Sequence, residues 1–278
     1  MIQKSRTQPI ISAANPIVKD VRRAIARGGL TDEGYCVAEG FHLLEEALRS
    51  DRDVPVVLAA ESVRDTVARH ISGLKTSRTV VLADALFQAI ASTETSQGVI
   101  ALVRPAEWSM SQLFRGQSLV VVLDGLQDPG NAGAIVRAAE AFGATGLLFI
   151  KGTVSPHHPK TLRASAGSIF RVPHMTGVDA SLARASLAQN GVSVFAAMPF
   201  TGSERVIGDV DFERRCAIII GSEGRGISQE LQGCAEDIAI PTVAVESLNA
   251  AVAASVMLYE VRRQRAAGGS IEQPMRRP

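Results

Sequence analysis

The sequence is poor in aromatic residues and in cysteine. Aromatic residues make up 4% of its 278 residues, and the three cysteines are Cys36, Cys216 and Cys234. Their odd number and wide spacing, with no histidine at a ligand-like interval, argue against a disulfide framework and against a zinc site. The adjacent His157 and His158 lie in an expected loop that offers no further ligands. We therefore expect reduced, structural thiols and no bound metal.

Long hydrophobic runs are also absent. No uninterrupted apolar run approaches the roughly 20 residues that a membrane-spanning helix needs, and residues 1–12 lack the apolar core of a signal peptide. These features predict a cytoplasmic protein that does not enter a membrane. The net charge is only +1, so overall charge does not point to a nucleic-acid partner. With 46% hydrophobic and 21% charged residues, the chain is expected to be globular, and its length allows two domains.

The first part of the chain predicts a small α/β domain over residues 1–106. Apolar residues at helical spacing indicate a helix from Asn15 to Arg27, with Asn15 as its N-cap and Pro16 at its first position. Its outer side is basic and carries Lys19 and Arg22. Further helices are expected at 39–49, 62–70 and 83–90, between strands at 35–38, 55–60, 79–82 and 98–103.

Residues 104–117 interrupt this pattern with Pro105, Trp108, two serines and a glycine, so 107–117 is the expected linker. A second domain is predicted over residues 118–278. Residues 118–124 are continuously apolar, which is typical of a strand buried on both faces. Helices are expected at 132–142 and 248–265, and strands at 146–150, 169–172, 192–197, 216–220 and 237–240. This alternation predicts a mainly parallel sheet with ligands at the C-terminal ends of its strands.

Three strand-to-helix junctions carry residues suited to chemistry. The first spans residues 124–144 and places Gly130, Asn131 and Gly133 after a buried strand, where backbone amides can approach an anionic ligand. It matches neither the dinucleotide fingerprint nor a P-loop, which argues against a nicotinamide-dependent enzyme. Arg137 follows two turns into the helix, where it contacts either a ligand or a neighbouring acid.

The second junction, residues 216–228, is an apolar strand that ends in Gly221-Ser222-Glu223-Gly224-Arg225-Gly226. Three glycines in six residues indicate either a tight turn or a loop whose backbone contacts a ligand. The third junction, residues 237–265, places Ser247 and Asn249 at the start of the last helix, and capping explains one of them more readily than both.

Together these junctions resemble the three sequence motifs of the SpoU/TrmH family, within the SPOUT superfamily of RNA methyltransferases. The matching residues are Pro129-Gly130-Asn131 with Arg137, then Gly221-Ser222-Glu223-Gly224 with Gly226, then Ile240-Pro241 with Ser247-Leu248-Asn249. The first domain is similar to the family's accessory substrate-binding domain in Asn15-Pro16, Lys19, residues 37–48 and Gln97-Gly98-Val99. The resemblance covers practically the whole chain.

The resemblance implies a parallel sheet with a deep trefoil knot, an exception to the rule against knots. It also implies S-adenosylmethionine as cofactor, a homodimer with each active site near the subunit interface, and methylation of a ribose 2'-hydroxyl in RNA. Cofactor-binding residues would be Gly221, Gly226, Ile240 and Leu248. Catalytic residues would be Arg137, Asn131, Glu223, Ser247 and Asn249. Lys19 and Arg22, with Arg137, would contact the RNA.

Two departures from the family pattern concern the third motif. Thr242 stands where the family more often has methionine, in a stretch about one residue shorter than its commonest form, and Ala251 replaces a frequent serine. The accessory domain favours large-subunit ribosomal RNA as substrate. Transfer RNA is the alternative within the same fold, and a non-catalytic RNA-binding factor that kept the fold is the alternative from another class.

Overall fold

The structure is a computed structural model that describes residues 8–72, 78–202 and 205–268. The chain divides into two compact units. Unit 1 comprises the described residues up to Glu107 together with Ser155–Arg171, and unit 2 comprises Trp108–Val154 and the described residues from Val172 onward. The expected α/β class is confirmed: unit 2 contains a larger parallel sheet, and the N-terminal unit is separate. No helix within the described ranges is both long and apolar enough to cross a membrane.

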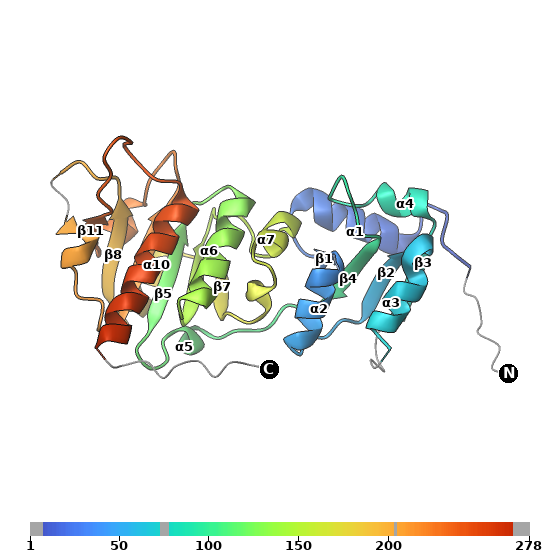
Figure 1. The fold of residues 1–278 in the computed structure, drawn as a ribbon, viewed down its shortest axis with the longest axis horizontal. Coiled ribbons are helices and arrows are strands. Elements are labelled where there is room, and N and C mark those ends of the chain that lie inside the picture. The colour runs from blue at the N-terminus through green and yellow to red at the C-terminus, as the bar shows by residue number, and fades with distance from the viewer. Residues whose placement is uncertain (1–7, 73–77, 203–204, 269–278) are drawn as a thin grey trace. The chain divides into compact units, whose positions relative to one another are not determined.

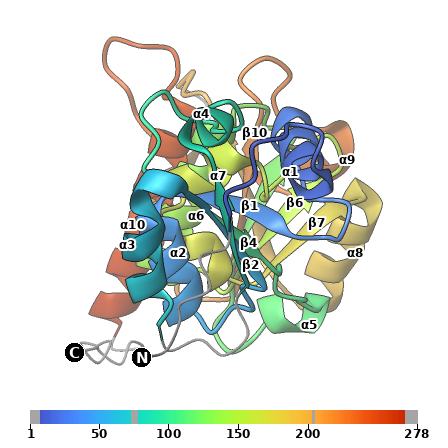
Figure 2. The ribbon, with the colours of Figure 1, turned by 90° about the vertical axis from the view of Figure 1, so that its right-hand side faces the viewer.

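Unit 1 is built on a four-stranded sheet of order β1-β4-β2-β3. The strands are β1 (Cys36–Glu39), β2 (Val56–Ala60), β3 (Arg78–Leu82) and β4 (Val99–Val103). Strand β4 runs antiparallel to both β1 and β2, whereas β2 and β3 are parallel. The helices are α1 (Pro16–Arg27), α2 (Phe41–Arg49), α3 (Arg64–His70) and α4 (Asp84–Gln88). Figure 2 shows α1 on one side of the sheet and α2 and α3 on the other.

Helix α1 begins and ends where the sequence predicts. The Asn15 side chain accepts a hydrogen bond from the Ile17 amide at 3.1 Å, and Gly28 ends the helix in the left-handed conformation with φ of 63°. The buried face of α1 carries Val18, Val21 and Ala24, which pack into the core of unit 1. The opposite face stays exposed and is free for polar contacts.

Residues 155–171 leave the fold of unit 2 and pack within unit 1. They form α7 (Pro159–Ala164) and the short helix η2 (Ser168–Phe170). Arg163 donates to the Ser92 hydroxyl at 2.6 Å, and Arg171 pairs with Glu46 at 2.6 Å. The sequence predicts a loop around His157 and His158 and a segment that belongs to the second domain. Its few apolar positions are buried against another part of the chain, which a local pattern does not reveal.

Unit 2 is a seven-stranded sheet of order β7-β6-β5-β10-β8-β11-β9, in which every neighbouring pair is parallel. The strands are β5 (Leu119–Asp124), β6 (Gly146–Ile150), β7 (His174–Val178), β8 (Ser193–Met198), β9 (Arg205–Val206), β10 (Cys216–Gly221) and β11 (Glu236–Ala239). Helices α6 (Pro129–Ala141) and α10 (Ala250–Ala267) pack against each other beside β5 (Figure 1). Helices α5 (Met110–Leu113), α8 (Ala180–Gln189) and α9 (Gln229–Gln232) contribute to the core on the other face.

Three expected elements differ from the structure. The predicted strand 169–172 is wrong, because Ser168–Phe170 form a 3-10 turn and the strand β7 follows it. The predicted linker 107–117 contains α5, whose Leu113 is fully buried in the core of unit 2. Helix α6 begins at Pro129 rather than 132, so Gly130 and Asn131 lie inside the helix and not in a turn before it. The trefoil knot stays a prediction.

Candidate active site

A pocket of about 360 Å³ lies at the C-terminal ends of three adjacent strands of unit 2. Its lining comes from the segments that follow β8 and β10, from the segment between β11 and α10, and from the first turns of α10. Parallel strands bring their carboxyl ends to one edge of a sheet, which is where such folds bind ligands. All four residues expected to contact a cofactor line this pocket: Gly221, Gly226, Ile240 and Leu248.

The loop after β10 forms one wall of the pocket and is held closed by its own backbone. The Ser222 amide donates to the Gly226 carbonyl at 3.1 Å, and the Gly226 amide donates back to Ser222 at 2.9 Å. A Cβ atom on Gly221 would lie 2.5 Å from the Gly226 carbonyl carbon. Glycine is therefore required at position 221 because the backbone of the loop returns so closely over it.

The segment between β11 and α10 also lines the pocket. The Thr242 hydroxyl donates to the Val245 carbonyl at 2.7 Å, which closes a turn just before Glu246 and Ser247. Thr242, Glu246 and Ser247 all line the pocket. The turn thus orients the residues that connect the pocket to the start of α10.

Asparagine side chains join the three junctions. Asn249 caps α10 by accepting from the Ala251 amide at 2.9 Å, and its Nδ2 donates to Asn131 Oδ1 at 3.1 Å. Asn131 in turn donates through Nδ2 to Glu223 Oε1 at 2.6 Å. Asp128 caps α6 by accepting from the Asn131 amide at 2.7 Å. Segments more than 90 residues apart in sequence therefore meet in one polar chain at the edge of the pocket.

The structure brings together most, but not all, of the expected catalytic residues. Glu223 and Ser247 line the pocket, and Asn131 and Asn249 reach it through the polar chain. Arg137 lies on the exposed face of α6, outside the described lining of the pocket, and makes no hydrogen bond or ion pair with any described residue. Its guanidinium is therefore available to a ligand or to another chain.

Several pocket residues were not expected from the sequence. Met198 ends β8 and Phe200 follows it, Glu246 precedes the third motif's serine, and Met257 lies on α10. The strand over 192–197 was predicted, and the rule that ligands gather at strand C-termini would have indicated residues 198–200. Within the described ranges, no group of three or more histidine, cysteine or acidic side chains is arranged to hold a metal ion.

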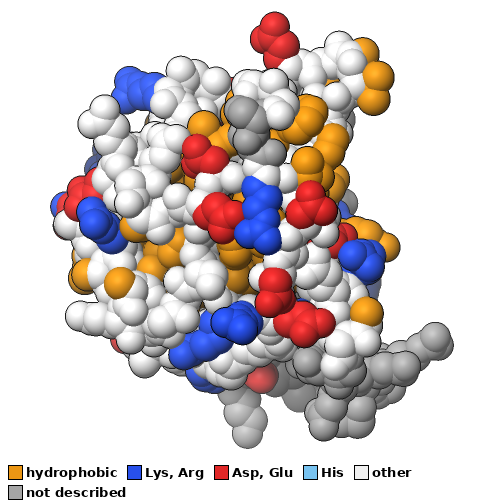
Figure 3. Space-filling model, turned by 90° about the vertical axis from the view of Figure 1, so that its left-hand side faces the viewer, with side chains coloured by type: hydrophobic (Ala, Val, Ile, Leu, Met, Phe, Trp, Pro, Cys, Tyr) orange, Lys and Arg blue, Asp and Glu red, His pale blue; other side chains and the backbone are white. Residues whose placement is uncertain are grey.

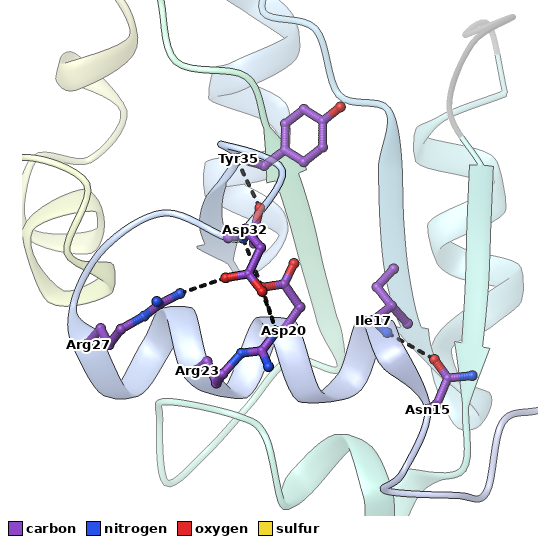
Figure 4. A network of polar contacts seen from close by, with 8 residues as sticks. Asn15, Ile17, Asp20, Arg23, Arg27, Asp32 and Tyr35 are labelled. Carbon is purple, nitrogen blue, oxygen red and sulfur yellow. Dashed lines mark hydrogen bonds and ion pairs between the residues drawn. The ribbon is translucent and has the colours of Figure 1, made fainter.

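The exposed side of α1 in unit 1 presents two kinds of cation. Arg27 pairs with Asp32 at 3.0 Å, and Arg23 pairs with the same carboxylate (Figure 4). Lys19 and Arg22 are exposed and form no ion pair with any residue in the described part of the chain. These two expected RNA-contacting side chains therefore differ from their neighbours in keeping an uncompensated charge.

Comparison with known proteins gives both units a counterpart. The model of the SpoU rRNA methylase family matches residues 118–259, and the model of the MRM3-like substrate binding domain matches residues 15–101. A Synechocystis protein described as an uncharacterized tRNA/rRNA methyltransferase is 33% identical over 263 residues, covering 92% of this chain and 93% of its own length. The Bacillus subtilis 23S rRNA (guanosine(2553)-2'-O)-methyltransferase RlmP is 30% identical, covering 91% of this chain and 98% of its own.

Solved structures give the same result. The AdoMet-bound rRNA methyltransferase from Sinorhizobium meliloti is 26% identical, with a TM-score of 0.78 over 92% of this chain and 97% of that one. A structure described as an RNA 2'-O ribose methyltransferase is also 26% identical, with a TM-score of 0.74 over 93% of this chain and all of that one. The likeness extends over both units.

Proposed function

Because this chain belongs to the SpoU rRNA methylase family and is an S-adenosylmethionine-dependent RNA methyltransferase, we propose that it methylates a ribose 2'-hydroxyl of large-subunit ribosomal RNA. The observation that supports this substrate best is the 30% identity to the Bacillus subtilis 23S rRNA 2'-O-methyltransferase, which spans nearly all of both chains. The match includes the accessory domain, which resembles a substrate-binding domain.

The pocket of unit 2 fits the cofactor in size and in chemistry. Its volume of about 360 Å³ lies in the range of small-molecule sites, roughly 300 to 1,000 Å³. Its lining is largely apolar, and the returning backbone at Gly221 leaves no room for a side chain there. We assign cofactor contacts to Gly221, Gly226, Ile240 and Leu248. Bound S-adenosylmethionine supplies a methyl group on a sulfonium, ready for attack by an oxygen nucleophile.

The polar chain from Asn249 through Asn131 to Glu223 holds the edge of the pocket in one geometry. Methyl transfer needs an in-line approach of the oxygen to the methyl group. Fixing the acceptor ribose against this edge is therefore the main contribution of these residues to the rate, and such positioning lowers the activation barrier of well-oriented reactions by roughly 7 to 11 kcal/mol. Ser247, beside the chain, offers a hydroxyl to the ribose. These residues act as positioning and hydrogen-bonding groups.

Arg137 is assigned to the phosphate and ribose of the target nucleotide. A guanidinium remains protonated at neutral pH, with a pKa above about 12 in water, so it suits bidentate phosphate binding better than proton abstraction. Its exposed position on α6 leaves it free for this contact. The 2'-hydroxyl proton would leave to a phosphate oxygen or water held by Arg137.

We propose that the active enzyme is a homodimer formed through α6 and α10. The exposed face of α10 carries Val252, Val256 and Tyr259 at helical spacing, and Tyr259 packs edge-on against Phe142 at the end of α6. Exposed apolar residues grouped in this way are typical of a protein interface. Arg137 projects from the same pair of helices, so the dimer would bring it next to an active site.

The test is transfer of labelled methyl groups from S-adenosylmethionine to unmodified 23S ribosomal RNA and, separately, to transfer RNA. We expect label in the ribosomal RNA at an alkali-resistant linkage, because a 2'-O-methyl group blocks hydrolysis of the adjacent phosphodiester. If only transfer RNA were labelled, the substrate would be transfer RNA and the proposal of ribosomal RNA would be wrong. Label in an alkali-sensitive position would overturn ribose methylation.

Arg137 variants test the proposed role of the guanidinium in the same assay. Arg137→Ala is expected to lower turnover by about 100-fold or more, and Arg137→Lys to recover only a small part, because lysine cannot bind phosphate through two parallel hydrogen bonds. Arg184→Lys on α8 serves as the control. Near-normal turnover of Arg137→Lys would contradict a guanidinium-specific role.

A further inference from the structure

The charge inside the pocket of unit 2 has one sign. Among its described lining residues, the charged side chains are Glu223 and Glu246, and the remainder are apolar, glycine, serine or threonine. Elsewhere on this unit acidic and basic side chains are interspersed, as the face in Figure 3 shows. A ligand in the pocket therefore meets negatively charged side chains, and no positively charged ones, among these lining residues.

The two glutamates are not equivalent. Glu223 accepts a hydrogen bond from Asn131 Nδ2 at 2.6 Å and belongs to the polar chain at the edge of the pocket. Glu246 lines the pocket but makes no hydrogen bond or ion pair with any residue in the described ranges. The Thr242–Val245 turn holds the chain just before it. A carboxylate placed on a pocket wall without a protein partner is available to a cationic ligand.

Methyl transfer changes the charge of the cofactor. S-adenosylmethionine carries a sulfonium, an ammonium and a carboxylate, with a net charge of +1. After the methyl group leaves as part of the new ether bond, sulfur keeps the electron pair, and S-adenosylhomocysteine is neutral overall. A negative wall attracts the first more strongly than the second.

We propose that Glu246 is a specificity residue that favours the charged methyl donor over the neutral product, and so helps the product to leave. The inference rests on the proposed placement of the cofactor in this pocket. Because Glu246 is exposed, water and salt weaken its effect, and we expect it to account for about a threefold to fivefold preference.

The test is isothermal titration calorimetry on the full chain with S-adenosylmethionine, S-adenosylhomocysteine and sinefungin, an analogue with an amine-bearing carbon in place of the methylated sulfur. In Glu246→Gln, we expect about threefold to fivefold weaker binding of the two cationic ligands and unchanged binding of S-adenosylhomocysteine. Glu246→Asp should retain most of the preference. Glu230→Gln, which removes an exposed carboxylate outside the pocket lining, should change none of the three affinities.

The outcomes separate the inference from the function on which it rests. Equal weakening of all three ligands in Glu246→Gln would mean that Glu246 shapes the pocket rather than selecting charge, and unchanged affinities would remove its role altogether. If the wild-type chain bound S-adenosylmethionine but Gly221→Val bound it equally well, the placement of the cofactor would be wrong. Raising the salt concentration should narrow the wild-type preference for S-adenosylmethionine over S-adenosylhomocysteine more than it narrows the preference of Glu246→Gln, which keeps only Glu223.

Discussion

Arg265 is a buried arginine near the end of α10. It belongs to a basic stretch at the end of α10, yet it is only 6% exposed. Its guanidinium donates to four backbone carbonyls, those of Phe212, Gln117, Ser118 and Arg214, at 2.8 to 3.1 Å. It therefore ties the end of α10 to the start of β5 and to the segment before β10.

Replacement of Arg265 by lysine should destabilise unit 2 strongly. An ammonium group has three donors on a flexible stem and cannot satisfy four carbonyls in a fixed arrangement, so buried acceptors lose their partners. We expect the free energy of unfolding to fall by about 2 to 4 kcal/mol in urea denaturation. Arg263→Lys, whose exposed side chain pairs with Glu260, is the matched control and should cost less than about 1 kcal/mol. Equal effects would show that the carbonyl contacts are unimportant.

His174 gives a prediction about pH. Burial lowers the pKa of His174 below its ordinary value, and a hydrogen bond between its Nδ1 and the Val172 carbonyl opposes the shift only in part. In the unfolded chain this imidazole binds a proton with a pKa of about 6.5, whereas in the folded chain it binds the proton only at lower pH. The contribution of His174 to the free energy of unfolding should therefore be greatest above about pH 6.5 and should fall as the pH drops below that value.

Urea denaturation at pH 8.0, 6.5 and 5.5 measures this effect. His174→Gln should show a smaller loss between pH 8.0 and 5.5, whereas His42→Gln, at an exposed position, should keep the wild-type loss. His158 contributes with the same sign, because burial and then the charges of Arg163 and Lys160 lower its pKa. An unchanged pH profile in His174→Gln would exclude His174 as a cause.

The buried thiols agree with the interpretation of the cysteines as structural. Burial raises the pKa of Cys36 to about 12 and that of Cys216 to about 11, so neither forms appreciable thiolate at neutral pH. Their packing, rather than their reactivity, decides their role.

At the scale of elements, the contact between α1 and α7 joins two segments far apart in sequence. A Cβ atom on Gly28 would lie 2.2 Å from Cδ2 of His158, and the same His158 caps α7 by accepting from the Lys160 amide at 3.0 Å. The close packing of the end of α1 against the start of α7 therefore requires a glycine at position 28 and the His158 ring in its capping position.

A pair of glycine substitutions isolates this contact. Gly28 and Gly34 both have a positive φ, of 63° and 84°, but no atom lies within 4 Å of a Cβ on Gly34. Gly34→Ala should cost about 1 to 2 kcal/mol of unfolding free energy for its backbone conformation alone, and Gly28→Ala about 1 to 3 kcal/mol more for the clash. Adding His158→Ala to Gly28→Ala should recover part of that difference. Equal costs at both glycines would mean that the imidazole moves aside freely.

At the scale of the whole molecule, the exposed apolar face of α10 predicts self-association. We expect a dimer in light scattering and a shift towards monomer in Val256→Glu, because a buried carboxylate without a partner is costly at an interface. Leu182→Glu places the same charge on another exposed apolar side chain, on α8, and should leave the dimer intact. A monomeric wild-type enzyme with full turnover would overturn the proposed homodimer.

The basic face of α1 predicts how RNA binding depends on salt. Charge reversal by Lys19→Glu with Arg22→Glu should weaken RNA binding by about tenfold or more. It should also flatten the dependence of binding on salt, because a protein that contacts fewer phosphates releases fewer counterions. S-adenosylmethionine affinity should stay unchanged. The matched pair Arg69→Glu with Arg78→Glu, also exposed in unit 1, should have little effect. Equal loss of RNA and cofactor binding would point to misfolding.

The sequence by itself determined the main helices and strands around the pocket and the motifs that line it. Caps, helical spacing and buried strands identified α1, β5, β10 and α10 to within a few residues, because these signals depend on neighbouring residues alone. The resemblance of the three junctions to the family's motifs pointed to Gly221, Gly226, Ile240 and Leu248, which the structure places in one pocket.

Only the tertiary structure decided which distant segments meet. In the structure, residues 155–171 pack within unit 1, and the expected linker contributes to the core of unit 2. Glu246 lies on the wall of the pocket. It also buried Arg265 while leaving Arg137 exposed on α6. A local pattern records that a residue is apolar, charged or able to cap a helix. Its partner, its burial and its solvation depend on chain segments that only the folded arrangement brings together.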